Sequence, residues 1–525
     1  MPALPTTSDV LVLGAGHNGL VAAVFLARAG LRVTVVEEKA MIGGACKTEK
    51  PFPKAPNLAT STGAYLLGVM PPELVAKLGV DIPLAKRDPH YFLPTQDTRY
   101  LLFGSDRAAM QRQFLEFFSE RDWRANEALT AEIAALREDV APAWLQEPLT
   151  IEGTAERFVR PALRQAFVDL CRKPVADYLA RFDFRSDLLR AMYAVTDGFS
   201  GIHGTWSTPG TGMNFLDHNM CRLPGTDGTF TIVKGGMGVV TSLIGDAARK
   251  AGAIIETGRK VESIVVDGET VRGVVLSDGT ELRAKVVVCN ADPFRMRDLV
   301  GKARLPAEYN TRLDGYLRDG TTMKVNLALR GLPKFKCLPE DKGQYGPTIH
   351  LLPEEKDVIA SLEKSFADVK EGKLPEFPTM EWYIHTTVDP TMKDAEGHHN
   401  SALFVQWVPY ALSGGTSWEK EEARYVKHLL SICDRFAPGT SDLVVDTFPL
   451  TPPKIESHFG ITRGHIHHVD NGFGFSDRLP YATPIAGLYS CSAGTHPAGG
   501  ITGCSGHNAA MRVLADLGLG SVPQA

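Results

Sequence analysis

The sequence VLVLGAGHNGLVAAVFLARAG, residues 10–30, decides the fold of this chain. An apolar run is followed by three glycines, Gly14, Gly16 and Gly19, and then by a helical stretch. In such a turn the first glycine permits a sharp bend, the second lets the backbone approach a pyrophosphate, and the third lets helix and strand pack closely. The N-terminus of the helix adds free N–H groups and the positive end of the helix dipole. The stretch therefore predicts a dinucleotide-binding site.

A second strand, Val33–Glu37, is expected after Gly30, which ends the helix. Glu37 lies 18 residues after Gly19, where an acidic side chain receives the ribose hydroxyl pair of a dinucleotide. Strand, helix, second strand and terminal acid are therefore in register. By itself this unit is compatible with either NAD or FAD.

The composition is that of an ordinary globular protein. The chain has 525 residues, 44% of them hydrophobic and 22% charged, a length that predicts two or three domains. The net charge of −5 argues against nucleic acid as a partner. No apolar run approaches the roughly 18 residues that span a bilayer, and no secretion signal is visible. We therefore expect a cytoplasmic protein, with peripheral membrane association left open.

The cysteines and histidines predict no metal site. Eight cysteines are scattered without a CxxC pair, which leaves a dithiol redox centre and a thiolate zinc site unsupported. Isolated cysteines suit a reducing compartment. His465, His467 and His468 are close in sequence, but a loop that makes hydrogen bonds explains them better than a metal.

Three separated stretches carry the pattern of parallel strands and glycine turns: 1–75, 228–300 and 455–525. We expect them to form one cofactor domain. Residues 76–106 and 301–454 are predicted to form a substrate domain with a mixed sheet, and residues 107–227 a helical substrate or lid insertion. The elements expected within these stretches include the strands Ala253–Thr257, Val261–Val266, Val271–Leu276, Leu282–Val288, Met323–Leu329, Met380–Val388 and Ala402–Val408, and the helix Trp418–Phe436.

A second strand–glycine turn–helix unit lies near the C-terminus. The strand Gly487–Cys491 runs into the glycine-rich turn Gly494–Gly503, and a helix is expected from about Ser505. A helix N-terminus at this turn would stabilise the negative charge that a flavin ring gains on reduction. The pair Gly43-Gly44, which many flavin enzymes use, points the same way, so the combination favours FAD over NAD.

These residues resemble the phytoene desaturase-related family of the flavoprotein amine-oxidase superfamily, and within it the group named for pyridine nucleotide-disulfide oxidoreductase domain-containing protein 2. The resemblance covers nearly the whole chain. The absence of CxxC contradicts the disulfide part of that group's name. Beyond the units above, the motifs that carry it are Thr208–Gly212, Gly235–Gly238, Asn290–Pro293, Leu450–Pro452 and Ala493–Pro497.

The resemblance implies a Rossmann-like α/β fold and FAD as the cofactor. Many relatives carry Arg directly after the paired glycines, where this chain has Ala45, so a side-chain phosphate contact is in doubt there. The residues implied to hold the ADP half are Gly14, Gly16, Gly19, Glu37, Gly43, Gly44 and Val261, with Ala15, His17, Asn18, Glu38 and Ala45 as neighbouring contacts. Those implied to lie near the ribityl chain and isoalloxazine are Gly494, Thr495, Gly499, Gly500 and Ile501.

The resemblance also implies an FAD-dependent oxidoreductase, similar to desaturases and dehydrogenases. It would form or reduce a C=C bond in an apolar polyene, isoprenoid or acyl-like substrate, with hydride transfer to or from flavin N5. Two alternatives stay open: a redox-neutral isomerase or hydratase that uses reduced FAD, and a non-catalytic FAD-binding scaffold. Amine oxidation on the same fold is a further alternative, because a fold does not fix a function.

No strong catalytic signature is present. Phe199–Met220 mixes aromatic residues with polar ones, as a ligand pocket does, and supplies His203 and His218 as candidate catalytic residues. The segment that leads into the C-terminal turn supplies His468 and Asp470. The expected partners are a small apolar substrate and an electron acceptor that is oxygen, a quinone or NAD(P). The oligomeric state cannot be predicted.

Overall fold

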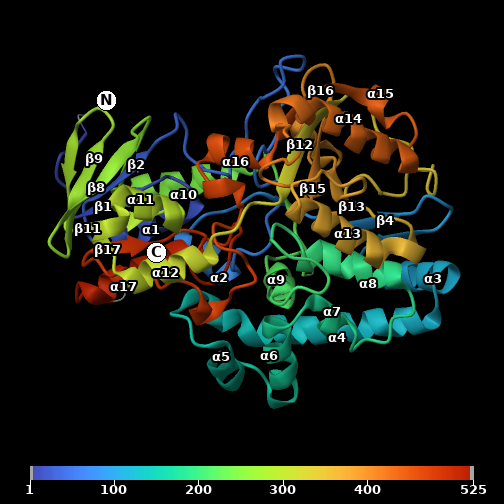
Figure 1. Cartoon of the computed structure of the whole chain (residues 1–525), viewed down its shortest axis with the longest axis horizontal. Helices are drawn as coiled ribbons and strands as arrows, with labels where there is room; N and C mark the ends of the chain where they lie inside the picture. Colours follow the sequence, from blue (N-terminus) through green and yellow to red (C-terminus); the bar gives the residue numbers. More distant parts are fainter. Residues whose placement is uncertain (1–3, 227, 521–525) are drawn as a thin grey trace.

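The computed structural model describes residues 4–226 and 228–520. One half of it is built on a five-stranded parallel sheet (Figure 1). The sheet joins segments from both ends and from the middle of the chain. Its strands, in spatial order, are β17 (Leu488–Ser490), β11 (Val286–Cys289), β1 (Val10–Leu13), β2 (Val33–Glu37) and β7 (Ile254–Thr257).

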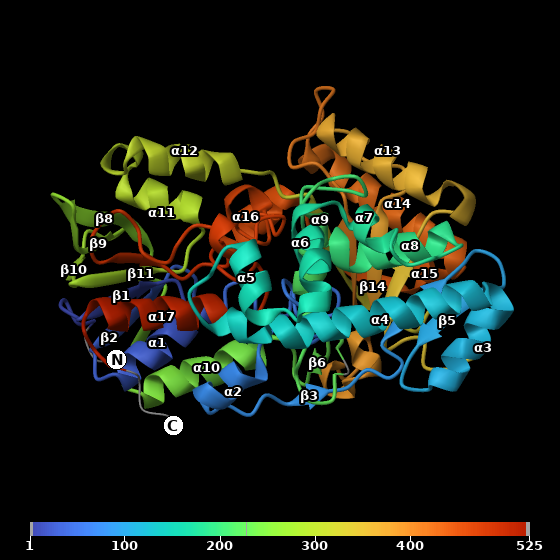
Figure 2. The ribbon, with the colours of Figure 1, turned by 90° about the horizontal axis from the view of Figure 1, so that it is seen from below.

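Helices cover one face of this sheet, and a small antiparallel sheet with two further helices covers the other (Figure 2). Successive residues of β1 face opposite sides, as in any strand. Val10 and Val12 pack against the helices of the first face, and Leu11 and Leu13 pack against the small sheet and its two helices on the second face. The elements of the first face are α1 (His17–Arg28), α10 (Gly238–Lys250) and α17 (Cys504–Asp516); those of the second are β8 (Val261–Asp267), β9 (Thr270–Leu276), β10 (Glu281–Arg283), α11 (Pro293–Val300) and α12 (Ala307–Tyr316).

The prediction of a single strand over Leu282–Val288 is wrong. The structure divides this stretch between β10, which pairs with β9, and β11, which pairs with β1 and β17. The burial pattern gives the reason. β10 alternates between exposed and buried residues, as a strand with one wet face does, whereas all four residues of β11 are buried, as in a covered parallel sheet.

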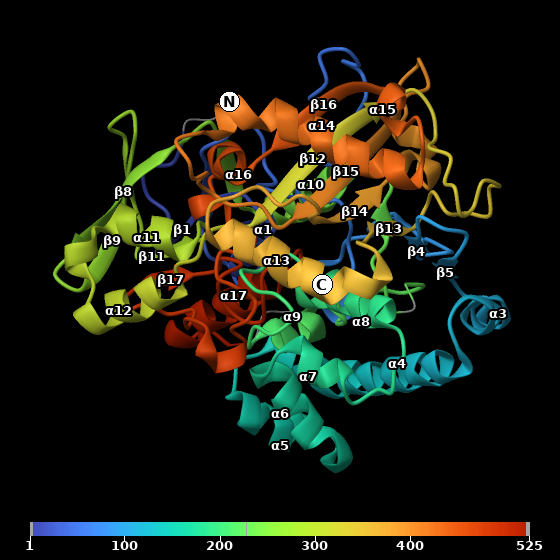
Figure 3. The ribbon, with the colours of Figure 1, turned by 45° about the vertical axis from the view of Figure 1, so that its right-hand side comes forward.

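The other half of the molecule contains a seven-stranded mixed sheet in which only the β13–β4 pair is parallel (Figure 3). The long helix α14 (Trp418–Phe436) packs on one face of it and has the bounds expected from the sequence. The strands, in order, are β16 (Val444–Leu450), β12 (Thr322–Leu329), β15 (His399–Gln406), β14 (Thr379–Tyr383), β13 (Thr348–Leu351), β4 (Tyr91–Pro94) and β5 (Tyr100–Phe103). The strand expected over Met380–Val388 therefore ends early, because a 3-10 turn follows.

Helices fill most of the segment between β5 and β6 (Ile232–Val233), and they share one core with α13 (Val358–Lys370). They are α3 (Arg107–Phe117), α4 (Glu120–Val140), α5 (Ile151–Phe158), α6 (Arg164–Arg172), α7 (Val175–Leu179), α8 (Asp187–Tyr193) and α9 (Thr211–His218), with the short helices η1 (Ala141–Leu145) and η2 (Pro161–Leu163) and the π-helix η3 (Ala194–Gly198). The remaining elements are α2 (Pro72–Leu78), β3 (Leu84–Ala85), η4 (Lys302–Arg304), η5 (Glu355–Asp357), η6 (His385–Thr387), η7 (Pro390–Met392), α15 (Thr440–Leu443), α16 (Pro452–Phe459), η8 (Thr462–Gly464) and η9 (Phe475–Asp477).

The predicted α/β class is confirmed: a parallel sheet built from three chain segments, a mixed sheet and a helical insertion are all present. The exact domain boundaries stay a prediction. Across the described residues, 4–226 and 228–520, no helix combines the length and the apolar character needed to cross a bilayer.

Candidate functional site

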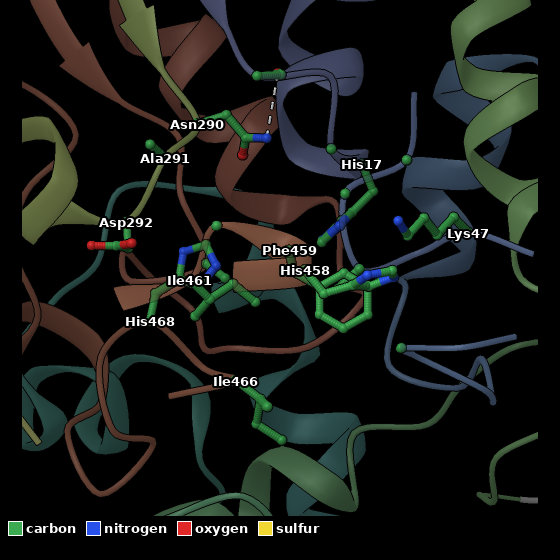
Figure 4. Close-up of a pocket in the computed structure, with 18 of the residues that line it drawn as sticks. His17, Lys47, Asn290, Ala291, Asp292, His458, Phe459, Ile461, Ile466 and His468 are labelled. Atoms are coloured by element: carbon green, nitrogen blue, oxygen red, sulfur yellow. Dashed lines mark hydrogen bonds between the residues drawn. The ribbon is translucent and has the colours of Figure 1, made fainter. Parts of the chain in front are cut away.

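An elongated cavity begins at the carboxyl edge of the parallel sheet and reaches the seven-stranded sheet. Leu13 and Glu37, which end β1 and β2, line its first part, and Lys324 of β12 and Phe404 of β15 line its far part. The cavity has a volume of about 290 Å³, within about 1730 Å³ of empty space that includes its open mouth. The carboxyl edge of a parallel α/β sheet is where such folds bind ligands. Figure 4 shows Asn290, Ala291 and Asp292 along one wall and His17 and Lys47 across from them.

The first glycine turn has the conformation that a pyrophosphate cradle requires. Gly14 adopts a φ of +97°, and a Cβ on Gly19 would lie 2.2 Å from the carbonyl oxygen of Gly14. A Cβ on Gly16 would lie 2.8 Å from Nδ2 of Asn290, which itself donates to the Gly14 carbonyl at 3.4 Å (Figure 4). Gly16 is the N-cap of α1 and offers no side chain to its N–H groups. These groups are therefore available to an anion, which fits the phosphates of FAD.

Glu37 occupies the position predicted to receive a ribose. Its Oε2 accepts a hydrogen bond of 2.7 Å from the N–H of Ala15, and its Oε1 accepts one of 2.8 Å from the N–H of Lys39. A carboxylate has about four acceptor sites, so capacity for ribose hydroxyls remains. Glu38, beside it, pairs with Arg295.

The paired glycines lie directly against the first turn. The N–H of Gly43 donates to the carbonyl of Ala15 at 2.8 Å, and a Cβ on Gly44 would lie 3.4 Å from the Cα of Gly16. Both glycines have positive φ, +123° and +59°. The structure therefore brings together the two glycine motifs that the sequence keeps apart.

The C-terminal turn contributes Gly500 and Ile501 to the cavity. Behind it, the fully buried guanidinium of Arg478 donates to the carbonyls of Ala493 at 3.1 Å and Gly494 at 3.3 Å. Burial lowers the pKa of Arg478 to about 10. This arginine, which holds the turn by its backbone, was not predicted, because no local pattern distinguishes it from a surface arginine.

The residues expected to hold FAD divide into two groups. Those that line the cavity are Gly14, Gly16, His17, Asn18, Glu37, Glu38, Gly43, Gly44, Ala45, Val261, Gly500 and Ile501. Those that shape the turns without being part of the lining are Ala15, Gly19, Gly494, Thr495 and Gly499.

Of the four candidate catalytic residues, His468 lines the cavity and the other three do not. Asp470 Oδ2 accepts the backbone N–H of His203 at 2.8 Å and lies 3.4 Å from Nε2 of His465. Burial raises the pKa of the Asp470 carboxyl, but these hydrogen bonds outweigh it and hold the pKa well below its usual range. His218 lies 3.9 Å from Asp197, and burial lowers its pKa to about 4. These interactions hold segments of the chain together beside the cavity.

Two histidines of the described cavity lining each contain an unpaired buried ring nitrogen. His468 has a left-handed backbone, with φ +63°, and its Nδ1 is buried without a hydrogen-bond partner among the described residues. Nε2 of His17, which lies on the opposite side in Figure 4, is also buried without a hydrogen-bond partner among the described residues. Burial lowers the pKa of both, that of His17 to about 4. Orphaned buried polar atoms are costly, and polar groups of a dinucleotide would satisfy them.

Lys324 and Tyr65 are cavity residues that sequence reasoning missed. Lys324 Nζ donates to the carbonyls of Ser61 at 2.5 Å and Gly63 at 2.7 Å, and it lies 4.5 Å above the ring of Tyr65. Burial lowers the pKa of Lys324 well below its usual value. The available signal was a lysine inside a mostly apolar strand, Met323–Leu329.

Apolar side chains form much of the cavity wall, and the carboxylates of the lining have partners within the protein. Glu37 accepts backbone amides, Glu38 pairs with Arg295, and Asp292 caps α11. Lys47, which pairs with Glu49 at 3.0 Å, and Lys324 also line the cavity. Apolar lining residues include Phe404, Leu450, Ile455, Phe459, Ile461 and Ile466.

Comparison with known proteins gives four concordant results. The family model described as flavin containing amine oxidoreductase matches residues 19–331. The mouse pyridine nucleotide-disulfide oxidoreductase domain-containing protein 2 is 32% identical over 97% of this chain and 94% of its own length. One of the subunits of limonene dehydrogenase from Castellaniella defragrans is 26% identical over 97% and 95%. The solved structure of wild-type putrescine oxidase bound to putrescine shares the fold, with a TM-score of 0.59 at 16% identity over 97% and 99%.

Proposed function

We propose that the substrate of this protein is an apolar isoprenoid or acyl-like compound. The premise is that the chain belongs to the flavin-containing amine oxidoreductase family and is an FAD-dependent oxidoreductase. The reaction would form or reduce a C=C bond by hydride transfer to or from flavin N5. The family and the FAD cofactor predicted from the sequence are confirmed by the comparisons. The limonene dehydrogenase relative, whose name states an isoprenoid substrate, supports the substrate class.

The lining of the far part of the cavity is the observation that carries this proposal. An amine substrate binds as an ammonium ion and needs a carboxylate or an aromatic cage to replace its water. Among the described residues that line the cavity, the three carboxylates already have partners within the protein, and the lining also holds Lys47 and Lys324. An ammonium ion would find no unpaired carboxylate among the described lining residues, whereas a hydrocarbon would meet Phe404, Leu450 and Ile466.

FAD, when bound, supplies the hydride acceptor or donor, and the protein supplies position, charge and a dry site. The α1 N-terminus and Glu37 would hold the ADP half, and Gly500 and Ile501 would lie near the ring. Lys324 would stabilise the negative charge of the reduced ring. The apolar wall would exclude water from the reacting carbon atoms.

Anaerobic stopped-flow mixing of the yellow protein with limonene and, separately, with putrescine tests the proposal. We expect limonene to bleach the flavin absorbance and putrescine to leave it unchanged. Oxygen, a quinone and NAD(P)⁺ are then supplied in turn to find which one restores the oxidised spectrum. The Gly19→Ala variant, which we expect to lose FAD, controls for bleaching outside this site. Bleaching by putrescine in place of limonene would assign amine oxidation and contradict the proposal.

A further inference from the structure

We propose that Tyr65 and Glu381 form a proton relay at the far end of the cavity. The inference rests on the proposed function, because forming a C=C bond by dehydrogenation releases a proton besides the hydride. Tyr65 takes this proton from the substrate and passes its own phenolic proton to Glu381. In the reducing direction the same two groups return the proton to the substrate.

Tyr65 connects the cavity to a carboxylate that lies behind the wall. Tyr65 lines the cavity, and its hydroxyl lies 3.4 Å from Oε2 of Glu381. Glu381 belongs to β14, is 8% exposed and is not part of the lining. The hydroxyl of Tyr383 donates to the same oxygen. The phenol of Tyr65 therefore stands between the cavity and this carboxylate.

Glu381 is held as an anion that is able to accept a proton. Burial raises its pKa, but hydrogen bonds from His350 and Tyr383 outweigh burial and leave the pKa below its usual value. His350 Nε2 lies 3.3 Å from Oε1 of Glu381, and the opposite ring nitrogen of His350 bonds the hydroxyl of Tyr91 at 2.6 Å. Tyr91 thus holds the imidazole from one side, and the other ring nitrogen lies beside the carboxylate of Glu381.

Tyr65 needs this partner to act as a base. Burial and the nearby Glu381 raise its pKa well above the usual value, so the phenol keeps its proton at neutral pH. Transfer of that proton to Glu381, concerted with its replacement from the substrate, avoids a free phenolate.

The surroundings of Tyr65 support charge development on its oxygen. Lys324 Nζ lies 4.5 Å above the ring, and the rings of Tyr383 and Phe404 lie at 4.5 Å and 6.0 Å. The protonated form of Lys324 stabilises partial phenolate character on Tyr65 in a site from which water is excluded. The packed rings hold the hydroxyl in one direction, toward Glu381.

The step balances in atoms and electrons. One substrate C–H bond breaks, its proton bonds to the Tyr65 oxygen, and its electron pair becomes the π bond as the adjacent carbon loses hydride to the oxidised flavin. The Tyr65 O–H bond breaks, and that proton bonds to Oε2 of Glu381. Glu381 becomes neutral, Tyr65 is unchanged, and FAD is the oxidant.

The test uses the FAD-loaded variants Tyr65→Phe, Glu381→Gln, Glu381→Asp and the double variant Tyr65→Phe/Glu381→Gln. Anaerobic flavin reduction is followed at rising concentrations of limonene. We expect the maximal rate to fall about 100-fold or more in each of the first two variants, with half-saturating limonene within about 3-fold of wild type. The double variant should be no slower than the slower single variant, and Glu381→Asp should regain part of the rate.

Matched controls come from a tyrosine and a glutamate outside the cavity. Tyr425 donates to the carbonyl of Pro375, and Glu422 pairs with Lys454. Tyr425→Phe and Glu422→Gln should reduce flavin at the wild-type rate. The relay would be overturned by wild-type rates in Tyr65→Phe or Glu381→Gln, or by losses of rate that multiply in the double variant. A rise in the half-saturating limonene concentration with an unchanged maximal rate would also overturn it.

An infrared measurement tests the pair without any substrate. The carboxylate bands that vanish in Glu381→Gln should shift in Tyr65→Phe, which removes one hydrogen bond from Oε2, and stay in place in Tyr425→Phe. Unshifted bands in Tyr65→Phe would overturn the relay whatever compound the enzyme oxidises. If limonene fails to bleach the wild-type flavin while the bands do shift, the proposed substrate fails and the Tyr65–Glu381 pair stands.

Discussion

The backbone N–H of Ala15 donates a hydrogen bond of 2.7 Å to Oε2 of Glu37, so the first glycine turn and the acidic end of β2 form one unit. The other carboxylate oxygen accepts the N–H of Lys39 at 2.8 Å. Glu37 is 7% exposed, so both bonds are shielded from water. One carboxylate therefore orients the turn that faces the phosphates and stands where the ribose is expected.

Glu37→Gln should weaken FAD binding because an amide has one acceptor oxygen in place of two. Hydrogen bonds to a charged group contribute about 1.5–3 kcal/mol, so we expect the Kd for FAD to rise about 10- to 100-fold. Quenching of flavin fluorescence during titration of the apoprotein measures it. Glu422→Gln, which lies outside the cavity, should bind FAD like wild type, and an unchanged Kd in Glu37→Gln would contradict the assignment.

Two glycines of the first turn should differ when replaced by alanine. In Gly19→Ala the new Cβ meets the backbone oxygen of Gly14 at 2.2 Å, so we expect loss of FAD and a loss of stability of about 1–3 kcal/mol. In Gly16→Ala it meets only the Asn290 amide, which can move, so FAD binding should suffer more than stability. Gly315→Ala, on α12 with nothing within 4 Å of the new Cβ, is the control and should be neutral or stabilising. Chemical denaturation and flavin content of the purified variants measure both effects, and equal behaviour of all three would refute this explanation.

Asp292 should matter more than an ordinary helix cap. Its Oδ1 accepts the N–H groups of Phe294 and Arg295 at the start of α11, and its Oδ2 accepts the N–H and hydroxyl of Thr462. Asp292→Ala should cost about 2–4 kcal/mol of stability, since it removes a cap and leaves the loop that leads to His468 unanchored, and it should lower FAD affinity.

The matched control is Asp106→Ala. Asp106 caps α3 through a single bond to the N–H of Ala109, at an exposed position. We expect a cost of about 1 kcal/mol and unchanged FAD affinity. Urea denaturation and FAD titration of the two variants measure the difference, and equal costs would show that the bonds to Thr462 contribute nothing.

Lys324→Met should lower the reduction potential of the flavin. A negatively charged reduced ring favours the protonated form of Lys324 and is stabilised by it in turn, and methionine removes that charge while keeping the side-chain length. For a two-electron couple about 30 mV corresponds to 1.4 kcal/mol, so we expect a fall of tens of millivolts, measured against reference dyes. Lys373→Met, an exposed lysine that pairs with Glu371, should leave the potential unchanged. A potential that rises or stays constant in Lys324→Met would exclude this role.

Stability should fall as the pH drops from about 6.5 to about 4, because several histidines are buried in their neutral form. In this window the histidines of the unfolded chain bind protons, whereas those of the folded protein stay neutral. The free energy of unfolding therefore falls by up to about 1.4 kcal/mol per pH unit for each such histidine. The histidines whose pKa burial lowers to about 3 or 4 are His17, His218, His385, His467 and His496.

Two buried carboxyls act in the opposite direction. Burial raises the pKa of Asp197 to about 7 and that of Asp217 well above its usual value, so the folded state keeps protons there that the unfolded chain releases. The histidines outnumber them, so the melting temperature of the FAD-loaded protein should fall between about pH 7 and about pH 5. His218→Gln should show a shallower fall, and a melting temperature that stays constant or rises on acidification would contradict the buried neutral state.

The sequence alone predicted the elements whose structure is local. The turn at Gly14–Gly19 follows from glycine positions between a strand and a helix, and α14 follows from helical periodicity up to Ala437-Pro438-Gly439. The stretch Leu282–Val288 was misassigned because both of its halves have strand-like composition. Which sheet each half joins depends on distant strands, β9 for one and β1 with β17 for the other.

The candidate site divides in the same way. Glycine motifs predict the dinucleotide end of the cavity, since sharp turns and close approach of the backbone to a ligand depend on glycines at particular positions of the local sequence. Tyr65, Lys324 and Glu381 were not predicted, because each is a single polar residue whose role comes from burial beside partners on other segments. His203 and His218 were chosen because their segment mixes aromatic and polar residues, and Asp470 because its segment leads into the C-terminal turn, yet all three lie outside the cavity lining. The sequence determined where the cofactor turns are, and only tertiary packing decided which polar groups share the cavity with the substrate, because desolvation and charge pairing depend on neighbours in space.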